Sequence, residues 1–176
     1  MAFLDTQHNI QQFDLGEGMS VADLGSGSGF YAVESARAVG SEGRVYAIDV
    51  QKDLLERIKT SANAERLFNI EVIWGDIEKI GGTKLAGASI DAIIISNTLF
   101  QIENKDDFLS EIKRILRPKG KVLVVDWTDS FGGLGPHQGS VFTQGQTEEL
   151  FKKNGFNVEK EISAGDHHYG IILRNK

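Results

Sequence analysis

The sequence predicts an α/β fold in which a mostly parallel sheet is covered by helices on both faces. Segments with the apolar pattern of a strand alternate along the chain with segments whose apolar residues recur at helical spacing. Such alternation is typical of parallel sheets, because the crossover between two parallel strands usually carries a helix. The run IDAIIIS at 90–96 is almost continuously apolar, as expected of a strand buried on both faces. We therefore expect a three-layer sandwich.

The first half of the chain carries three expected strands joined by two expected helices. The second helix has apolar residues at spacings i, i+1, i+4 and i+8, which places them on one face at the period of an α-helix. Gly40 follows the first helix at a position where glycine commonly ends one. In chain order we expect a short helix within 5–15, strands at 20–25, 44–49 and 70–74, and helices at 28–39 and 52–66.

The second half continues the alternation and ends in a hairpin. Residues 105–116 have the clearest helical pattern, and Pro118 and Gly120 follow as a stop and a turn. The glycine-rich stretch at 128–144 is long enough to indicate a functional loop. We further expect a loop at 80–89, strands at 90–96, 121–126, 156–163 and 168–174, and a helix at 146–154.

The composition is that of an ordinary globular protein. The 176 residues, of which 40% are hydrophobic, suit a single domain over 1–176. There is no cysteine, which excludes disulfides and thiol chemistry and leads us to expect a cytoplasmic protein. No apolar run is long enough to span a membrane, and the N-terminus lacks the pattern of a signal peptide.

The chain is acidic, with a formal net charge of −6, whereas proteins that bind nucleic acid usually carry a basic patch. Its one basic cluster, between Lys113 and Lys121, flanks the end of an expected helix, where cations suit the helix dipole. We therefore expect no nucleic acid as a partner. A monomer or a homodimer is expected.

The segment VADLGSGSGF at 21–30 organises the rest of the chain. Its apolar residues and Asp23 indicate the end of a buried strand, and Gly25, Gly27 and Gly29 follow at alternate positions before a helix. Glycine lets a backbone approach a ligand closely, and the start of a helix offers free N–H groups. A tight turn that uses glycine for geometry alone is the alternative. We favour a ligand-binding loop, because the alternate glycines follow the strand directly.

The spacing of the glycines separates two classes of cofactor. The dinucleotide fingerprint is G-x-G-x-x-G, with an acidic residue about 20 residues further on. This chain has G-x-G-x-G instead, and Asp49 lies twenty positions after Gly29, at the end of RVYAID. A carboxylate there can accept hydrogen bonds from both ribose hydroxyls of a nucleoside. The pattern indicates a nucleoside-containing cofactor and argues against NAD.

These segments resemble those of a known family. VADLGSGSG resembles motif I of the class I S-adenosylmethionine-dependent methyltransferases, and VYAID resembles their second motif. VIWGDIEKI, IDAIIISNTLFQI and EIKRILRPKGKVLVVDW continue the resemblance in the family's order. It implies a Rossmann-like sandwich whose seven-stranded sheet has the order 3-2-1-4-5-7-6, with strand 7 antiparallel. It also implies S-adenosyl-L-methionine as cofactor and S-adenosyl-L-homocysteine as product.

The resemblance assigns one part of the cofactor to the end of each strand. The glycine loop would pass the methionine and ribose, Asp49 would bind the ribose, and Asp76 with Ile77 would contact the adenine. Ser96 and Asn97 would face the methionine tail and the acceptor, with strand termination as the alternative for both. The residues expected to bind cofactor are Asp23, Gly25, Ser26, Gly27, Gly29, Asp49, Val50, Asp76, Ile77, Ser96 and Asn97.

The implied chemistry explains why no catalytic motif stands out. Methyl transfer from a sulfonium is an in-line displacement that rests on proximity and orientation, without a metal or a covalent nucleophile. A base is needed only if the acceptor must lose a proton. His137 and His168 are the candidates for that base or for acceptor contacts, because topology brings both to the carboxyl edge of the sheet. The alternative is that such histidines are ordinary polar turn residues.

The acceptor is the part that the sequence constrains least. Adenine-N-methylating members of the family carry Asn-Pro-Pro-aromatic after the fourth strand, whereas this chain has SNTL at 96–99. Arsenite-methylating members use cysteines, and this chain has none. We therefore expect the small-molecule branch that includes quinone-biosynthesis-type enzymes. A non-catalytic S-adenosylmethionine-binding module and an NAD(P)-dependent oxidoreductase are the alternatives.

Overall fold

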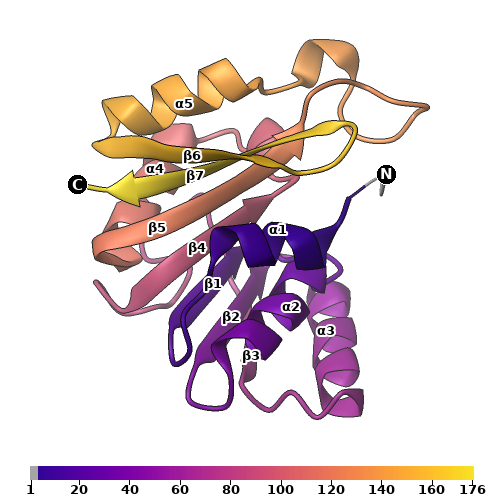
Figure 1. The fold of residues 1–176 in the computed structure, drawn as a ribbon, viewed down its shortest axis with the longest axis vertical. Helices are drawn as coiled ribbons and strands as arrows, with labels where there is room; N and C mark the ends of the chain where they lie inside the picture. Colours follow the sequence, from indigo (N-terminus) through magenta and orange to yellow (C-terminus); the bar gives the residue numbers. More distant parts are fainter. Residues whose placement is uncertain (1–3) are drawn as a thin grey trace.

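The computed structural model describes residues 4–176 and has a seven-stranded sheet at its centre (Figure 1). The strands are β1 (Ser20–Leu24), β2 (Arg44–Asp49), β3 (Ile70–Trp74), β4 (Ile90–Ser96), β5 (Leu116–Trp127), β6 (Phe156–Ser163) and β7 (His168–Asn175). The helices are α1 (Thr6–Phe13), α2 (Phe30–Val39), α3 (Lys52–Ala64), α4 (Lys105–Ile115) and α5 (Gln144–Lys153), with short 3₁₀ turns η1 (Leu99–Gln101) and η2 (Gln138–Ser140). Among the helices of residues 4–176, none has both the length and the apolar character needed to span a membrane.

The order of the sheet is β3-β2-β1-β4-β5-β7-β6, which confirms the order that the resemblance implied. β1 pairs in parallel with both β2 and β4, and β4 pairs in parallel with β5. β7 is antiparallel to both β5 and β6, so β6 runs in the same direction as the other strands. After β3 the chain crosses to the other half of the sheet, so the strand order reverses between the neighbours β1 and β4. Open α/β sheets bind ligands at the carboxyl ends of such a pair.

Two hydrophobic cores, one on each face of the sheet, hold the three layers together. α1, α2 and α3 cover one face, where Phe13, Ala36 and Ile58 belong to a single core (Figure 1). α4 and α5 cover the other face, where Phe108 and Phe151 belong to the second core. All five side chains are at most 2% exposed. The α/β sandwich expected from the sequence is therefore confirmed.

The side chains of β4 alternate between the two cores. Ile93 and Ile95 belong to the core under α4 and α5, and Ala92 and Ile94 belong to the core under α1, α2 and α3. Side chains of a strand alternate with a period of two, so a strand between two helical layers needs apolar residues on both sides. All four of these side chains are fully buried. This explains why IDAIIIS lacks the polar alternation of a half-exposed strand.

The start of β5 differs from the expected start at 121. The chain enters β5 directly from α4 at Leu116, which pairs with Ile90 before the register shifts to the pair of Ala92 and Lys121. Lys119 lies in this irregular stretch with φ 61°, in the left-handed region. The expected turn at 118–120 is therefore an irregularity inside a strand, because the ladder resumes after the extra residues.

Two helix starts also differ from those expected, and their caps explain the difference. α5 begins at Gln144 rather than 146, because the Thr143 Oγ1 accepts a hydrogen bond from the Gln146 N–H at 3.2 Å. The Gln146 Oε1 in turn accepts one from the Thr143 N–H at 2.8 Å, which completes a capping box. α2 begins at Phe30 rather than 28, because Gly29 is its N-cap and has φ 82°.

Candidate active site

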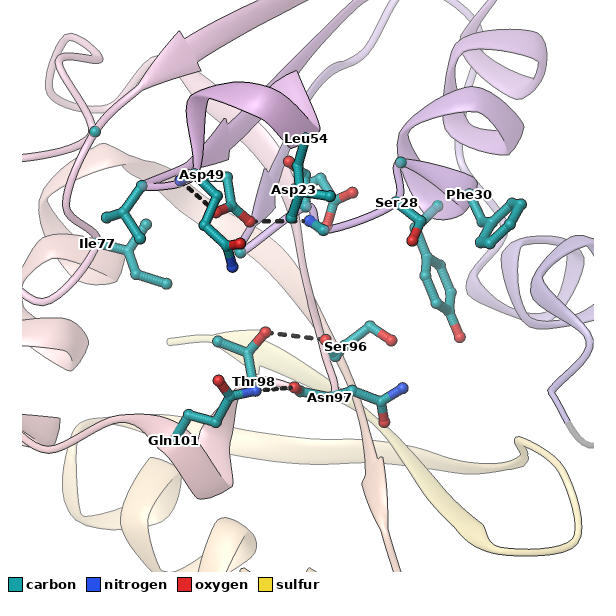
Figure 2. Close-up of a pocket in the computed structure, with 18 of the residues that line it drawn as sticks. Asp23, Ser28, Phe30, Asp49, Leu54, Ile77, Ser96, Asn97, Thr98 and Gln101 are labelled. Carbon is teal, nitrogen blue, oxygen red and sulfur yellow. Dashed lines mark hydrogen bonds between the residues drawn. The ribbon is translucent and has the colours of Figure 1, made fainter. Parts of the chain in front are cut away.

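A pocket of about 400 Å³ opens at the carboxyl ends of β1 and β4, at the switch point of the sheet (Figure 2). Its walls come mainly from the loops that follow β1, β2, β3 and β4. All eleven residues expected to bind cofactor line it, namely Asp23, Gly25, Ser26, Gly27, Gly29, Asp49, Val50, Asp76, Ile77, Ser96 and Asn97. The fold therefore gathers these residues at one place, while the part that each one plays remains a prediction.

The glycine loop after β1 is packed tightly at two glycines and open at the third. A Cβ at Gly25 would lie 2.7 Å from the Thr98 Oγ1, and a Cβ at Gly29 would lie 2.5 Å from the Ile58 Cγ1. A Cβ at Gly27 would have no heavy atom nearer than 4.0 Å, but its φ of 51° strains any residue with a side chain. Gly25 and Gly29 are thus required by packing, whereas the backbone of Gly27 is accessible from the pocket.

Asp49 connects the end of β2 to the glycine loop. Its Oδ2 accepts a hydrogen bond from the Gly27 N–H at 3.0 Å, and its Oδ1 accepts one from the Gln51 N–H at 2.9 Å (Figure 2). The residue is 8% exposed, so little water competes for its carboxylate. Each carboxylate oxygen retains a second lone pair. Asp49 can therefore shape the loop and still accept hydrogen bonds from two hydroxyls of a ligand.

Asp23 is a buried acid near the end of β1 that lines the same pocket. Its burial, and secondly the negative charge of Asp49, raise the pKa of the Asp23 carboxyl to about 7. Its Oδ2 has no hydrogen-bond partner within residues 4–176. A bound cation would favour the ionised form of this carboxyl and lower its pKa. The position therefore suits a ligand that carries positive charge.

A buried acid on β5, which the sequence analysis missed, holds the loop after β4. Asp126 accepts a hydrogen bond from the Leu99 N–H at 2.9 Å through Oδ2 and one from the Trp127 N–H at 2.8 Å through Oδ1. Burial raises the pKa of Asp126 to about 6, although backbone N–H donors act in the opposite direction. The signal in the sequence was an aspartate that ends the apolar run KVLVVDW, at the edge where the pocket lies.

The loop after β4 presents polar groups to the pocket. Asn97 has φ 52°, in the left-handed region that asparagine adopts more readily than most residues. The Thr98 Oγ1 donates to the Ser96 carbonyl at 2.9 Å, and the Gln101 Nε2 donates to the Asn97 carbonyl at 3.1 Å (Figure 2). The Asn97 Oδ1 and the Ser26 Oγ are buried and have no hydrogen-bond partner in the described part of the chain. Such groups are commonly satisfied by a ligand or water.

Asp76 already makes structural contacts at the turn after β3. Its Oδ1 accepts a hydrogen bond from the Glu78 N–H at 3.0 Å, and its Oδ2 lies 3.1 Å from the Lys79 Nζ. The hydrogen bond with Lys79 is the main reason that the pKa of Asp76 is lowered. The neighbouring Ile77 is 8% exposed and contributes an apolar surface to the pocket. This corner of the pocket combines a carboxylate with an apolar side chain, and its contact with an adenine remains a prediction.

The N-terminal segment lies along one side of the pocket, and α1 fastens it to the rest of the molecule. The Asn9 Nδ2 donates to the Tyr31 hydroxyl at 2.9 Å and to the Ala164 carbonyl at 3.3 Å. These bonds fasten α1 to α2 and to the end of β6. Tyr31 lines the pocket, as do Leu4 and Thr6 from the N-terminal segment. α1 therefore joins the two halves of the molecule beside the site.

The loop after β5 and the hairpin between β6 and β7 meet at the carboxyl edge, as expected from the topology. The Thr128 N–H donates to the His167 carbonyl at 2.9 Å. The His167 Nδ1 lies 3.0 Å from the Asp129 Oδ1, and the imidazole stacks on the Phe131 ring with centroids 3.9 Å apart. The structure thus contains a histidine–aspartate pair that the sequence analysis did not predict.

Neither candidate base is among the residues that line the pocket. His137 is exposed in the loop between β5 and α5. His168 is 6% exposed, and its imidazole lies against the Trp127 ring with centroids 4.4 Å apart. Neither histidine therefore contacts the cofactor pocket directly among the residues described. Their roles in catalysis remain predictions.

Comparison with known proteins defines the class of the protein. Residues 15–171 match a family described as a methyltransferase domain. An S-adenosylmethionine-dependent methyltransferase from Aquifex aeolicus has the same fold with a TM-score of 0.87 and 29% identity, over 98% of this chain and 90% of that one. The chain belongs to the methyltransferase domain family, in the class I group that depends on S-adenosylmethionine.

The curated relatives are larger methyltransferases. The ubiquinone/menaquinone biosynthesis C-methyltransferase UbiE of Haemophilus ducreyi is 28% identical over 116 residues, which are 64% of this chain and 42% of that protein. An arsenite methyltransferase of Aquipseudomonas alcaligenes is 34% identical over 115 residues, which are 62% of this chain and 33% of that protein. The chain thus spans less than half the length of these two relatives. The nicotinamide-dependent alternative finds no support among them.

The residues of the pocket fit S-adenosylmethionine, the cofactor of this class. The cofactor joins a nucleoside to a methionine that carries a sulfonium and an ammonium. The pocket offers two buried acids for its hydroxyls and positive charges, Asp49 and Asp23, and a loop without a side chain at Gly27. Within residues 4–176, no group of three or more His, Cys, Asp or Glu side chains is placed to hold a metal ion.

Proposed function

We propose that the protein transfers a methyl group from S-adenosylmethionine to a small organic molecule by in-line displacement. The observation that carries this proposal is the pocket at the switch point, where Asp49 is bonded to the Gly27 N–H and Asp23 is buried beside it. When bound there, S-adenosylmethionine supplies an electrophilic methyl group. The names of the relatives support a small-molecule acceptor.

The residues that would hold the cofactor lie at the ends of four strands. Asp49 would accept hydrogen bonds from the ribose hydroxyls, and Asp76 with Ile77 would contact the adenine. Asp23 would face the ammonium of the methionine part, because its open Oδ2 and its burial favour a cation. The other pocket residues proposed to contact the cofactor are Gly25, Ser26, Gly27, Gly29, Val50, Ser96 and Asn97.

The contribution of this chain to catalysis would be orientation rather than acid–base chemistry. A displacement at carbon needs the acceptor in line with the breaking bond, and fixed positioning can supply much of the rate enhancement. The loop after β4, which Asp126 anchors through the Leu99 N–H, is the element placed to orient the acceptor. His137 and His168 remain proposals for acceptor contacts or for a base.

Between the acceptor classes that the relatives' names suggest, we favour an organic molecule of the quinone type over arsenite. Soft ions such as arsenic(III) are held by thiolates, and this chain contains no cysteine. We also propose that residues 1–176 act as one domain, as a monomer or homodimer, without nucleic acid as a partner. A cytoplasmic location, expected from the composition, is likewise a proposal that cell fractionation tests.

The decisive experiment combines binding with turnover. Calorimetry with S-adenosylmethionine, S-adenosylhomocysteine and NADH should show binding of the first two only. Methyl-labelled S-adenosylmethionine, incubated with a panel of hydroxyquinols and with arsenite, should label an organic acceptor. Binding without turnover on any acceptor would favour the non-catalytic module, and binding of NADH alone would contradict the proposed function.

The label-transfer assay needs a control variant that removes the cofactor contact without unfolding the protein. Gly27→Ala serves this purpose, because no heavy atom lies nearer than 4.0 Å to the position of its Cβ and the strain at φ 51° costs only about 1 kcal/mol. Label transfer that persists in Gly27→Ala would have to come from a contaminating enzyme or from another site. Such a result would separate the activity from the pocket described above.

A further inference from the structure

A second pocket, of about 310 Å³, lies at the amino edge of the sheet, opposite the cofactor site. It is formed by the end of α2, the turn into β2 and the loop between α3 and β3, which lie at the same end of the sheet (Figure 1). None of the residues that line it lines the cofactor pocket. α2 contributes to both pockets at its opposite ends, with Phe30 and Tyr31 at the cofactor pocket and Ala36 and Arg37 at the second one.

Three arginines line this second pocket, and two of them lack a carboxylate partner. Arg37 forms ion pairs with Glu34 and Glu65. Arg44 and Arg66 are exposed, and neither has a carboxylate oxygen within 4.0 Å in the part of the chain that the structure describes. The pocket thus presents two guanidinium groups without a carboxylate oxygen within 4.0 Å, although the chain as a whole has a net charge of −6 and Glu17 lies beside Gly40 of the same pocket.

Arg66 occupies a position where glycine would be less strained. It follows the C-cap of α3 with φ 57°, in the left-handed region. The Leu67 N–H donates to the Ala62 carbonyl at 2.9 Å and the Arg66 N–H donates to the Asn63 carbonyl at 3.1 Å, which is the Schellman motif. Glycine is the usual residue at this position of the motif, because it has no Cβ. A strained arginine with an unpaired charge points to a use for its side chain.

An aromatic ring completes the second pocket. Phe68 is 75% exposed and lines it between Leu67 and Asn69. Asn69 is buried, and its Nδ2 is placed within 2.9 Å of the carbonyls of both Ala36 and Gly40. The loop that carries Phe68 is therefore fastened to the end of α2, which keeps the ring at the pocket. An exposed aromatic ring beside two guanidinium groups can stack on a planar ligand.

We propose that this second pocket binds a small aromatic phosphate ester. Two guanidinium groups match a phosphate, because each can donate two parallel hydrogen bonds to its oxygens. Phe68 would stack on the aromatic part of the ligand. The volume of about 310 Å³ is at the lower end of the range for pockets that bind small molecules, and this favours a small ligand over an acidic segment of a protein.

The test is calorimetry with phenyl phosphate, inorganic phosphate and phenol. We expect phenyl phosphate to bind about 3- to 10-fold more tightly than inorganic phosphate, the range for one aromatic contact, and phenol not to bind. Arg44→Gln and Arg66→Gly should each weaken binding about tenfold or more. Arg57→Gln is the matched control, because Arg57 is an exposed arginine of α3 outside the pocket.

Arg66→Gly also separates a binding role from a structural one. Glycine relieves the strain at φ 57°, so the melting temperature should stay equal to that of the parent protein or rise while binding is lost. A lowered melting temperature together with lost binding would assign Arg66 to the fold and overturn its part in the site. Binding should be the same with and without S-adenosylhomocysteine, since the two pockets share no lining residue.

Four other results would overturn the proposal. The first is the absence of phenyl phosphate binding at millimolar concentrations. The second is competition with S-adenosylhomocysteine, which would place the ligand in the cofactor pocket. The third is an equal loss of phenyl phosphate affinity in Arg57→Gln, which would attribute the effect to the overall charge of the protein rather than to this pocket. The fourth is tighter binding of a glutamate-rich peptide with the same dependence on Arg44 and Arg66, which would make the surface a protein-docking site.

Discussion

The Asp49 carboxylate accepts a hydrogen bond from the backbone N–H of Gly27 at 3.0 Å, across 22 positions of sequence. The bond joins the two segments that the sequence analysis assigned to the cofactor, the glycine loop after β1 and the acid at the end of β2. It means that Asp49 helps to hold the loop in the conformation in which its backbone faces the pocket. Substitutions of either residue therefore act on the same site.

We predict that Asp49→Ala weakens S-adenosylmethionine binding by about 1.5–3 kcal/mol, the cost of losing hydrogen bonds to a charged group. Isothermal calorimetry measures this directly. Glu56→Ala is the control, because Glu56 is an exposed acid of α3 that does not line the pocket. An affinity that Asp49→Ala leaves unchanged would remove Asp49 from the ribose role.

The glycine loop gives a prediction that contrasts two positions. Gly27→Ala should abolish or strongly weaken cofactor binding and lower stability only by the strain of a positive φ, about 1 kcal/mol. Gly29→Ala should destabilise the protein by about 2–3 kcal/mol, because its Cβ would lie 2.5 Å from the Ile58 Cγ1. Thermal unfolding and calorimetry together check both. Normal binding by Gly27→Ala would leave the glycines with a purely structural role.

The buried carboxyl of Asp23 makes stability depend on pH. Its pKa is about 7 in the folded protein, above its value of about 3.9 in an unfolded chain, so the native state binds more protons between these values. The contribution of Asp23 to the free energy of unfolding of the cofactor-free protein should therefore be highest below pH ~4. It should fall by about 2–4 kcal/mol as the pH rises to ~7.

Asp23→Asn should flatten that dependence, and chemical denaturation at several pH values measures it. In Asp23→Asn, the free energy of unfolding should still fall somewhat as the pH rises, because the pKa of Asp126 is also raised, to about 6. In the parent protein, cofactor affinity should increase as the pH rises through 7, since the ionised Asp23 attracts the cationic methionine part. An affinity that is independent of pH would contradict the assignment of Asp23 to the ammonium.

Asp126 is predicted to position the acceptor loop rather than to react. Asp126→Asn retains one carboxamide oxygen for the two N–H donors of Leu99 and Trp127, so stability should fall by about 1–3 kcal/mol. The turnover number should fall several-fold and cofactor affinity should fall less, because Asp126 itself does not line the pocket and acts only through the loop that carries Ser96 and Asn97. Equal losses in affinity and turnover would place its effect on the cofactor instead.

The two candidate histidines are tested by single alanine variants. Because neither lines the cofactor pocket, His137→Ala and His168→Ala should leave S-adenosylmethionine affinity unchanged. If either residue contacts the acceptor or acts as base, its variant should lower turnover at least about tenfold. His137 is exposed, so its variant should keep the parent stability, whereas His168→Ala should lose packing against Trp127. Unchanged turnover in both variants would exclude both histidines.

The strands that local sequence determines were predicted with their observed bounds. β2, β3 and β4 begin and end where expected, because each is an apolar run closed by an acid, a glycine or a polar residue. The start of β5 was missed because it depends on the pairing of Leu116 with Ile90, a contact between distant segments. The sheet order came from the resemblance and not from the pattern of residues, since pattern alone does not order parallel strands.

The residues of the candidate site also fall into two groups, those that short motifs predict and those that depend on contacts between distant segments. The eleven cofactor residues lie in short motifs at strand ends, where topology alone brings them together. The anchoring of η1 by Asp126 and the fastening of α1 through Asn9 depend on hydrogen bonds between distant residues, so no short motif indicated them. The arginines at the opposite edge gave no signal for a similar reason, because Arg37, Arg44 and Arg66 become neighbours only when three elements pack.

The position of β7 has a consequence for how the chain folds during synthesis. β7 follows every other strand in the chain, yet it lies between β5 and β6 in the sheet. Until β7 has left the ribosome, β5 has an open hydrogen-bonding edge and β6 has no strand neighbour at all. The half-sheet of β3, β2, β1, β4 and β5 can form earlier, since domains begin to fold from the N-terminal side. The nascent protein therefore presents an unpaired edge of β5, at which it can aggregate, until its seventh strand emerges. Slower translation through 156–175 would prolong that interval.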